Sequence, residues 1–248
     1  MAELKIEKMT KITETKAMPA KTYPNSNGAG FGFDEIENNP VQYYNGFLYH
    51  GTKKIHAQDI LENNFKISTG EELHLGKGVY FYDNETFAAW WMLRKTYYKM
   101  PNEKLKKYIS ESDLSICEEM YNIFKEEFGI IIVKIENAGY LDLDNTNNKI
   151  LFFKIFTEFM SKRTQYFSNA AIYDQILKLI APETKFDMVG FTTNIYELNK
   201  TQKIQKVKLP QDLVLYKIYC VKSIEILKKR KELNITRENI ENCLNFMI

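Results

Sequence analysis

The sequence predicts an α+β fold. Short apolar runs typical of strands, such as FLYH, GVYFY and IIIVKIE, alternate with stretches whose apolar residues recur at helical spacing. The 248 residues are 44% hydrophobic and 27% charged, which is the composition of a globular domain with a sizeable core. No internal repeat or low-complexity linker divides the chain, so one domain with appendages is expected.

Charge and cysteine content narrow the function classes. The chain has 34 Lys and Arg against 32 Asp and Glu, and a net charge of +2 predicts no nucleic-acid or membrane partner by itself. Cys117, Cys220 and Cys243 are few and far apart, which favours buried thiols in a reducing compartment over disulfides. The N-terminus lacks the apolar core of a signal peptide and no segment has the length of an apolar span, so we expect a soluble, cytoplasmic protein with no membrane partner.

Three regions are expected along the chain. Residues 1–45 are predicted to be an N-terminal extension that is partly flexible, and residues 46–232 the core domain. Within the extension, Gly28, Gly30 and Gly32 lie among Asn and Ser without a strand before them or a helix after them. A surface loop is therefore favoured over a phosphate-binding loop. Residues 233–248 are expected to form a C-terminal helix.

The first predicted elements carry the most informative residues. FLYH predicts a short strand that ends at His50, and Thr52 is expected to cap the helix that follows. GVYFY, which ends at Tyr82, predicts a second strand, and Asp83 or Asn84 is expected to cap the next helix.

The rest of the chain continues this alternation. Residues 93–130 predict an amphipathic helix, and IIIVKIE predicts a buried strand followed by GYLDLDN as a second extended piece. Residues 149–181 are expected to form a helical insertion. FDMVGFTTNIYEL and LPQDLVLYKIYCV then predict two strands, separated by the basic connector NKTQKIQKVK.

A single histidine at the end of a strand is more often a core residue than a ligand-binding one. The Gly-Thr that follows His50 and the later GKGVYF favour a binding role here. His56 and His74 lack partners at the spacing of metal ligands, so no metal site is expected.

LYHGT and LGKGVYFYD together resemble the two halves of the NAD pocket in ADP-ribosyltransferases of the diphtheria-toxin and poly(ADP-ribose) polymerase type, the His-Tyr-Glu superfamily. The resemblance covers residues 46–92 strongly and residues 207–228 loosely. It implies split, strongly curved antiparallel β-sheets with flanking helices and an NAD cleft between the sheets. LYHGT also occurs in RNA 2'-phosphotransferases, and GKGVYF favours NAD chemistry.

The resemblance also implies roles for individual residues, with NAD as co-substrate and no metal. His50 would bind the adenosine ribose, the backbone of Gly51 would hold the nicotinamide carboxamide, and Thr52 follows them in the same cofactor-binding segment. Tyr80 would stack on the nicotinamide ring, with Trp91 as a second stacking aromatic. Ala88 stands where the polymerases usually have a serine that donates to the carboxamide, so that hydrogen bond is missing or is supplied from elsewhere.

An acidic residue is needed because cleavage of the bond to nicotinamide passes through an oxocarbenium-like sugar. Alignment of the apolar run PQDLVLYKIYCV with the family's late strand puts Asp212 at the glutamate position and Gln211 beside it. Gln211 itself, or Glu197 from the preceding strand, remains an alternative.

The implied function is that of an enzyme, an NAD-dependent mono-ADP-ribosyltransferase acting as an intracellular toxin or effector of a toxin–antitoxin or antiviral defence system. Two basic stretches, residues 93–108 and 199–208, slightly favour RNA or DNA over protein as the acceptor. In that case Arg94, Lys95, Tyr97 and Tyr98 would border the acceptor side, although a run of lysines on an exposed helix is more often a solvated face. An antitoxin or chaperone protein is a candidate partner.

Two alternatives stay open. One is an RNA 2'-phosphotransferase, although the second motif has no Arg to hold an RNA phosphate. The other is a catalytically inactive module that binds NAD or a partner.

Overall fold

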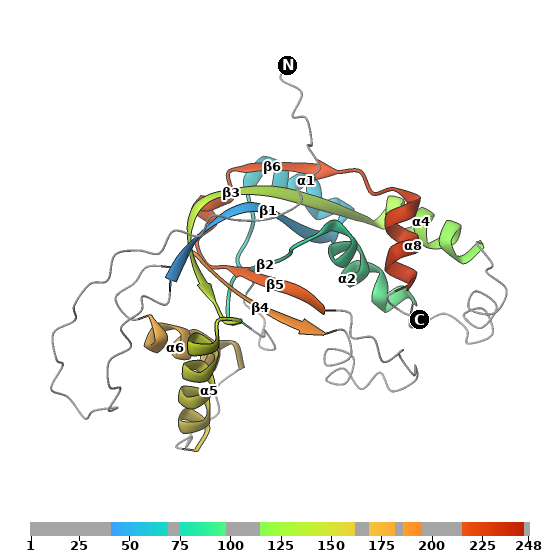
Figure 1. The fold of residues 1–248 in the computed structure, drawn as a ribbon. Helices are drawn as coiled ribbons and strands as arrows, with labels where there is room; N and C mark the ends of the chain where they lie inside the picture. The colour runs from blue at the N-terminus through green and yellow to red at the C-terminus, as the bar shows by residue number, and fades with distance from the viewer. Residues whose placement is uncertain are drawn as a thin grey trace, which may run out of the picture.

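The computed structural model describes residues 41–68, 75–97, 115–161, 169–181, 186–194 and 215–245 (Figure 1). These residues form an α+β structure, as predicted. The elements, in chain order, are β1 (Val41–Lys53), α1 (Lys54–Asn63), β2 (Val79–Tyr82), α2 (Glu85–Tyr97), α4 (Ser115–Glu127), β3 (Phe128–Asp142), α5 (Thr146–Ser161), α6 (Asn169–Ile180), β4 (Met188–Asn194), β5 (Leu215–Val221), the 3₁₀-helix η1 (Ile224–Ile226), β6 (Lys229–Leu233) and α8 (Arg237–Asn245).

The strands form one six-stranded sheet instead of two separate ones. Their order is β1-β2-β5-β4-β3-β6, and β1 also pairs with β3, which closes a ring of five strands with β6 on its outside. The β3–β4 pair is parallel and the other pairs are antiparallel.

Two narrow seams divide this ring. β1 and β2 are joined by the pair Tyr49–Tyr82, and β3 and β4 only by Tyr140–Asp142 against Met188–Gly190. By contrast, β1 and β3 are paired along almost their whole length. The strands β1, β3 and β6 therefore lie in an upper layer and β2, β5 and β4 in a lower one (Figure 1).

Alternation along the strands creates two hydrophobic clusters. Val79 and Phe81 of β2 belong to an inner cluster that takes buried side chains from all five ring strands, so this cluster fills the ring. Tyr80 and Tyr82 point the other way, into an outer cluster with residues of α2, α4 and α8. β3 contributes to both clusters, which explains why IIIV reads as an unbroken apolar run.

The start of α2 agrees with the sequence and the start of α1 does not. Asn84 caps α2, since its Oδ1 accepts a hydrogen bond from the Phe87 N–H at 2.9 Å. Thr52, the predicted cap of α1, instead lies within β1 opposite Gly129, and Lys53 takes the N-cap position without a side-chain hydrogen bond. The strand simply runs further than its apolar pattern suggested.

Other boundaries also move. β1 begins at Val41, inside the predicted extension, and β3 is one strand where two extended pieces were expected. The helix predicted over 93–130 is described as the end of α2 and as α4, with residues 98–114 outside the described part. The C-terminal helix begins at Arg237, after β6, and buries Ile240 and Leu244.

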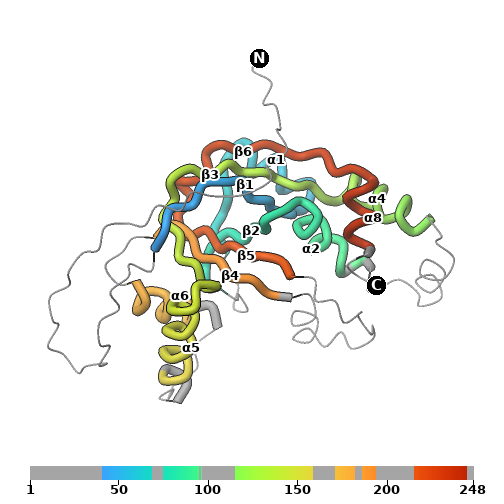
Figure 2. Tube along the Cα trace, viewed as in Figure 1, coloured from blue at the N-terminus to red at the C-terminus, as the bar shows by residue number. Residues whose placement is uncertain are grey.

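The predicted helical insertion at 149–181 corresponds to α5 and α6. Their aromatic side chains stack, with the Tyr173 ring 5.9 Å from Phe152 and 6.0 Å from Phe156. Figure 2 shows the two helices extending away from the strands. Cys117, Cys220 and Cys243 are buried free thiols, as predicted. Among the residues described, no helix has both the length and the apolar character to cross a membrane.

A methyl group added at Gly190 tests how tightly the ring is filled. A Cβ there would lie 2.9 Å from Tyr219 Cδ1 and 3.1 Å from the Ile218 carbonyl oxygen. Gly190→Ala should therefore lower the free energy of unfolding by about 1–3 kcal/mol, measured by urea denaturation.

Gly129→Ala is the matched control. Its Cβ would meet the Glu232 carboxylate at 3.0 Å, an exposed side chain that can move away, and the Ala57 Cβ at 3.3 Å, which needs a smaller shift than the contact at Gly190. An unfolding midpoint for Gly190→Ala at or above that of Gly129→Ala would contradict a filled ring.

Candidate functional site

His50 lies at the β1–β2 seam. Its half-buried ring packs edge-on against Phe65, with centroids 5.3 Å apart, and lies 5.5 Å from the Phe81 ring. Its Nδ1 is 2.8 Å from the Tyr80 carbonyl oxygen. A carbonyl only accepts hydrogen bonds, so Nδ1 carries the proton and Nε2 of the neutral ring is an acceptor.

The surroundings favour this neutral form. Burial lowers the pKa of His50 and outweighs the hydrogen bond to the Tyr80 carbonyl, which acts in the opposite direction. His50 is therefore an uncharged hydrogen-bond acceptor at neutral pH.

The same contact marks the place where the two strands separate. Continued beyond the pair Tyr49–Tyr82, the register would put Gly51 opposite Tyr80, but the ladder ends before that position. The His50 side chain takes the Tyr80 carbonyl instead. LYHGT and GKGVYF are thus joined through a side chain at the edge of the seam.

Gly51 is in close contact with helix α2. A Cβ at Gly51 would lie 2.5 Å from the Ala88 carbonyl oxygen and 2.7 Å from Met92 Cγ. Only glycine permits this approach of helix and strand. Ala88 itself is fully buried, so its methyl group is packed in the core at the position where the resemblance would place a serine.

The hydroxyl of Tyr80, unlike its ring, is engaged in hydrogen bonds within the protein. The hydroxyl donates a hydrogen bond to the Gly76 carbonyl at 2.7 Å and accepts one from the Leu75 N–H at 2.9 Å. Burial raises the pKa of Tyr80 well above its ordinary value. The hydroxyl is thus neutral and committed to the preceding turn, which excludes it as a general acid or base in this arrangement.

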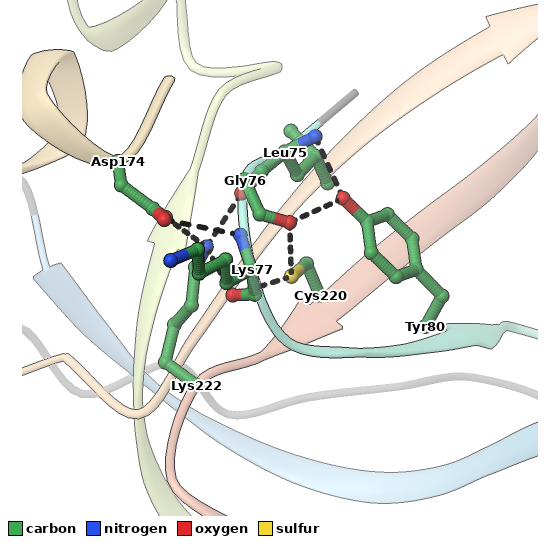
Figure 3. A network of polar contacts seen from close by, with 7 residues as sticks. All are labelled: Leu75, Gly76, Lys77, Tyr80, Asp174, Cys220 and Lys222. Carbon is green, nitrogen blue, oxygen red and sulfur yellow. Dashed lines mark hydrogen bonds and ion pairs between the residues drawn. The ribbon is translucent and has the colours of Figure 1, made fainter. Parts of the chain in front are cut away.

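Figure 3 shows how this turn, residues 75–78, is held. The Lys222 ammonium donates to the Leu75 carbonyl at 2.6 Å and the Lys77 carbonyl at 2.7 Å, and it pairs with Asp174 Oδ1 at 2.8 Å. Asp174 Oδ2 in turn accepts the Lys77 N–H at 3.1 Å. Neither Asp174 nor Lys222 is apparent from the sequence, because both belong to elements distant from the motif.

Trp91 contacts Arg94 of its own helix. The Arg94 guanidinium lies 3.1 Å from the centroid of the Trp91 ring and also donates to the Trp91 carbonyl. Within the described part of the chain, no ring contact joins Trp91 to Tyr80, and the nearest aromatic partner on that strand is Tyr82 at 6.1 Å. One face of Trp91 is therefore covered by a cation.

Arg94 is 6% exposed, which contradicts the expectation that it borders an acceptor surface. Its position is explained by its contact with Trp91 one helical turn earlier. The side chains of Lys95 and Tyr97, and all of Tyr98, lie outside the described residues.

Of the remaining predicted site residues, the structure describes Thr52 but not Gln211, Asp212 or Glu197. Thr52 is buried in β1, two residues beyond His50 and on the same face of the strand. Gln211, Asp212 and Glu197 lie outside the described residues, and β5 begins at Leu215. The acidic residue therefore stays a prediction.

A second charged cluster lies at the other end of β5. Lys217 Nζ is 3.0 Å from Asp142 Oδ1 and 2.8 Å from Asp144 Oδ2. Thr192 donates to Asp144 through both its backbone N–H and its hydroxyl. Burial alone would lower the pKa of Lys217, but the two carboxylates outweigh it and the pKa is raised. A lysine inside the apolar run LYKIYCV was the sequence signal for this cluster.

The charged side chains of this cluster form ion pairs with one another. Across the described ranges, no three or more His, Cys, Asp and Glu side chains are placed to hold a metal ion.

Comparisons with known proteins add one relative. No protein-family model matches the chain. An uncharacterized protein of Methanocaldococcus jannaschii is 28% identical over 199 residues, which cover 76% of this chain and 87% of that protein. No solved structure matches.

The lowered pKa of His50 predicts a pH dependence of stability. Between the folded-state pKa and the ordinary value of 6.5, the unfolded chain binds more protons at this site than the folded one. Acidification through this window should therefore reduce the free energy of unfolding. His50→Asn, which keeps a donor for the Tyr80 carbonyl, should show a smaller loss when urea unfolding is followed from pH 7.5 to 5.

The control is His56→Asn, because His56 is exposed on α1. It should show the wild-type slope. An equal slope in His50→Asn and wild type would mean that His50 titrates in the same way folded and unfolded.

Proposed function

We propose that this protein is an NAD-dependent mono-ADP-ribosyltransferase that releases nicotinamide and transfers a single ADP-ribose to a macromolecule. One observation carries the proposal: the motifs LYHGT and GKGVYF meet at the β1–β2 seam, where His50 binds the Tyr80 carbonyl at 2.8 Å. These are the motifs on which the resemblance to the His-Tyr-Glu superfamily rests. Two layers of strands joined at narrow seams are also compatible with an ADP-ribosyltransferase-like fold.

In this proposal NAD lies along the edge of the seam. His50 and Tyr80 pack in different clusters, the inner and the outer one, so a ligand that touches both must follow the line where β1 and β2 diverge. The neutral His50 ring would accept a hydrogen bond from a ribose hydroxyl through Nε2. That role requires the Nδ1–H group of His50 to keep donating its hydrogen bond to the Tyr80 carbonyl.

The nicotinamide ring would stack on Tyr80 near Gly51. The turn at 75–78 holds the Tyr80 hydroxyl, so the ring offers a preorganised aromatic face. Trp91 would contribute the face that Arg94 does not cover, since the nicotinamide of NAD is itself cationic and competes poorly with a guanidinium.

In the chemical step the bond between the ribose C1' and the nicotinamide nitrogen breaks, and its electron pair leaves with nicotinamide. A nucleophile of the acceptor then bonds to C1' and loses its proton. A carboxylate facing the ribose stabilises the positive charge that develops on the sugar. We assign this role to Asp212, with Gln211 or Glu197 as the alternatives.

The proposed acceptor rests on the composition of the sequence and not on contacts of the described side chains. RNA or DNA is slightly favoured by the basic stretches 93–108 and 199–208. A base would have to be unpaired to reach the ribose carbon, whereas a protein side chain would not. An intracellular toxin or effector restrained by an antitoxin or chaperone fits these properties.

A non-catalytic NAD- or partner-binding module is the second candidate. Two observations favour it: Ala88 supplies no hydroxyl for the carboxamide, and Arg94 covers one face of Trp91. An RNA 2'-phosphotransferase is a weaker alternative, because LGKGVYFYD holds no arginine.

Release of nicotinamide tests the enzyme proposal. His50→Ala and Tyr80→Ala should each reduce NAD cleavage by about a hundredfold, because a displaced reactant loses the alignment on which the rate depends. Turnover is measured as nicotinamide formed, and transfer as adenylate label on separate pools of RNA, DNA and protein.

His56→Ala provides the control, since His56 is exposed on α1 and has no role in the proposed site. Full activity in both His50→Ala and Tyr80→Ala would refute the assignment. A rise in melting temperature with NAD, but no turnover in wild type, would favour the binding module.

The acidic residue can be identified by neutral replacements. Asp212→Asn should abolish nicotinamide release but retain the NAD-induced rise in melting temperature, because the carboxylate acts mainly in the transition state. Gln211→Ala and Glu197→Gln, measured in parallel, should retain most of the turnover. The reverse result, with loss in Glu197→Gln only, would move the role to Glu197.

A further inference from the structure

The position of the Tyr80 ring depends on the turn at 75–78. The Tyr80 hydroxyl makes two hydrogen bonds to this turn, with the Leu75 N–H and the Gly76 carbonyl, and it also lies beside the Cys220 thiol of β5. Leu75 and Gly76 are buried. A shift of the turn would therefore carry the Tyr80 ring with it.

One ion pair, between Lys222 and Asp174, holds this turn. Lys222 uses its three ammonium donors on the Leu75 carbonyl, the Lys77 carbonyl and Asp174. Asp174 completes the arrangement by accepting the Lys77 N–H. The two side chains thus bind two carbonyls and one amide of a four-residue segment (Figure 3).

The pair is close-fitting and only partly exposed. The Lys222 and Asp174 side chains are 18% and 25% exposed, so solvent screens them less than it screens a surface pair. Gly76 has a φ of +77°, and a Cβ there would lie 2.1 Å from Asp174 Oδ1. A glycine is required for the carboxylate to reach the turn.

Lys222 and Asp174 are both attached to well-packed segments of the fold. Lys222 follows β5 directly, and its N–H donates to the Asp187 carbonyl at 2.7 Å just before β4. Asp174 is on α6, whose Ile172 and Ile176 are buried in the outer cluster. Cys220, opposite Tyr80 in the β2–β5 ladder, adds weak contacts from its thiol to the Gly76 and Lys77 carbonyls.

We propose that Asp174 and Lys222 are positioning residues: through the turn at 75–78 they hold the Tyr80 ring in the orientation that stacks on the bound ligand. The inference rests on the proposed function for the identity of that ligand, the nicotinamide of NAD. It gives the helical insertion a role in the site, since α6 supplies one of the two residues. Neither residue touches the ligand in this proposal.

The test first measures the ligand-free protein. Amide hydrogen exchange is followed by NMR at Leu75, which is bonded to Tyr80, and at Lys77, which is bonded to Asp174. Asp174→Ala should accelerate exchange at both amides by tenfold or so, although Asp174 contacts only one of them. Tyr80→Phe should accelerate Leu75 alone. Unchanged exchange at Leu75 in Asp174→Ala would overturn the positioning role.

The second measurement uses NAD. Displacement of the Tyr80 ring is a smaller change than its removal, so Asp174→Ala and Lys222→Met should lower kcat/KM for NAD by about tenfold, against about a hundredfold for Tyr80→Ala. Asp174→Asn, which keeps an acceptor oxygen, should restore most of the wild-type kcat/KM. An unchanged kcat/KM in both Asp174→Ala and Lys222→Met would overturn the proposal.

Two controls separate the possible failures. Lys229→Met removes a lysine from the exposed pair with Glu136 and should leave both exchange and kcat/KM unchanged. If Asp174→Ala does not fold, Lys222→Met carries the exchange measurement, because it removes the other half of the same ion pair. Absence of NAD binding and turnover in wild type would refute the proposed function, whereas unchanged Leu75 exchange would refute the positioning role alone.

Discussion

The hydrogen bond from His50 Nδ1 to the Tyr80 carbonyl joins the two layers of this structure at their narrowest point. The β1–β2 ladder is limited to Tyr49 opposite Tyr82, and beyond that pair this side-chain contact joins the two strands. A carbonyl that is partly withdrawn from water needs a donor. His50 supplies it, and in doing so adopts the tautomer that leaves Nε2 as an acceptor.

The charges around β5 obey the same constraint as this carbonyl. Lys217 is enclosed by Asp142 and Asp144, and Lys222 by Asp174 and two backbone carbonyls. A half-buried ammonium is stable only where its donors are satisfied. One such group ties β5 to the end of β3, and the other ties it to the turn before β2. β5 is thereby held at both ends by ion pairs to distant segments.

The residues of the proposed NAD site differ in what already contacts them. The Tyr80 hydroxyl and the Gly51 backbone are committed to contacts with the turn and with α2. Trp91 is different, because the buried Arg94 of the same helix covers one face of its ring. The orientation of the Tyr80 ring is thus set by the fold, and the proposed role of Trp91 depends on its other face.

Some features follow from local sequence alone. The strand GVYFY, the cap at Asn84 and the unbroken apolar run of β3 depend on neighbouring residues, and all three were predicted. The burial of the three thiols also follows from composition. LYHGT and GKGVYF identified His50, Gly51 and Tyr80 as candidate site residues before any contact was known.

Tertiary structure decided the rest. Ring closure through β1–β3, the extension of β1 past Thr52, and the pairing of Asp174 with Lys222 depend on register and twist between segments far apart in the chain. Sequence patterns report which face of an element is apolar, but not which distant element covers it. For the same reason the sequence by itself marked Tyr80 as a candidate site residue, and only the folded chain decided what holds its ring in place.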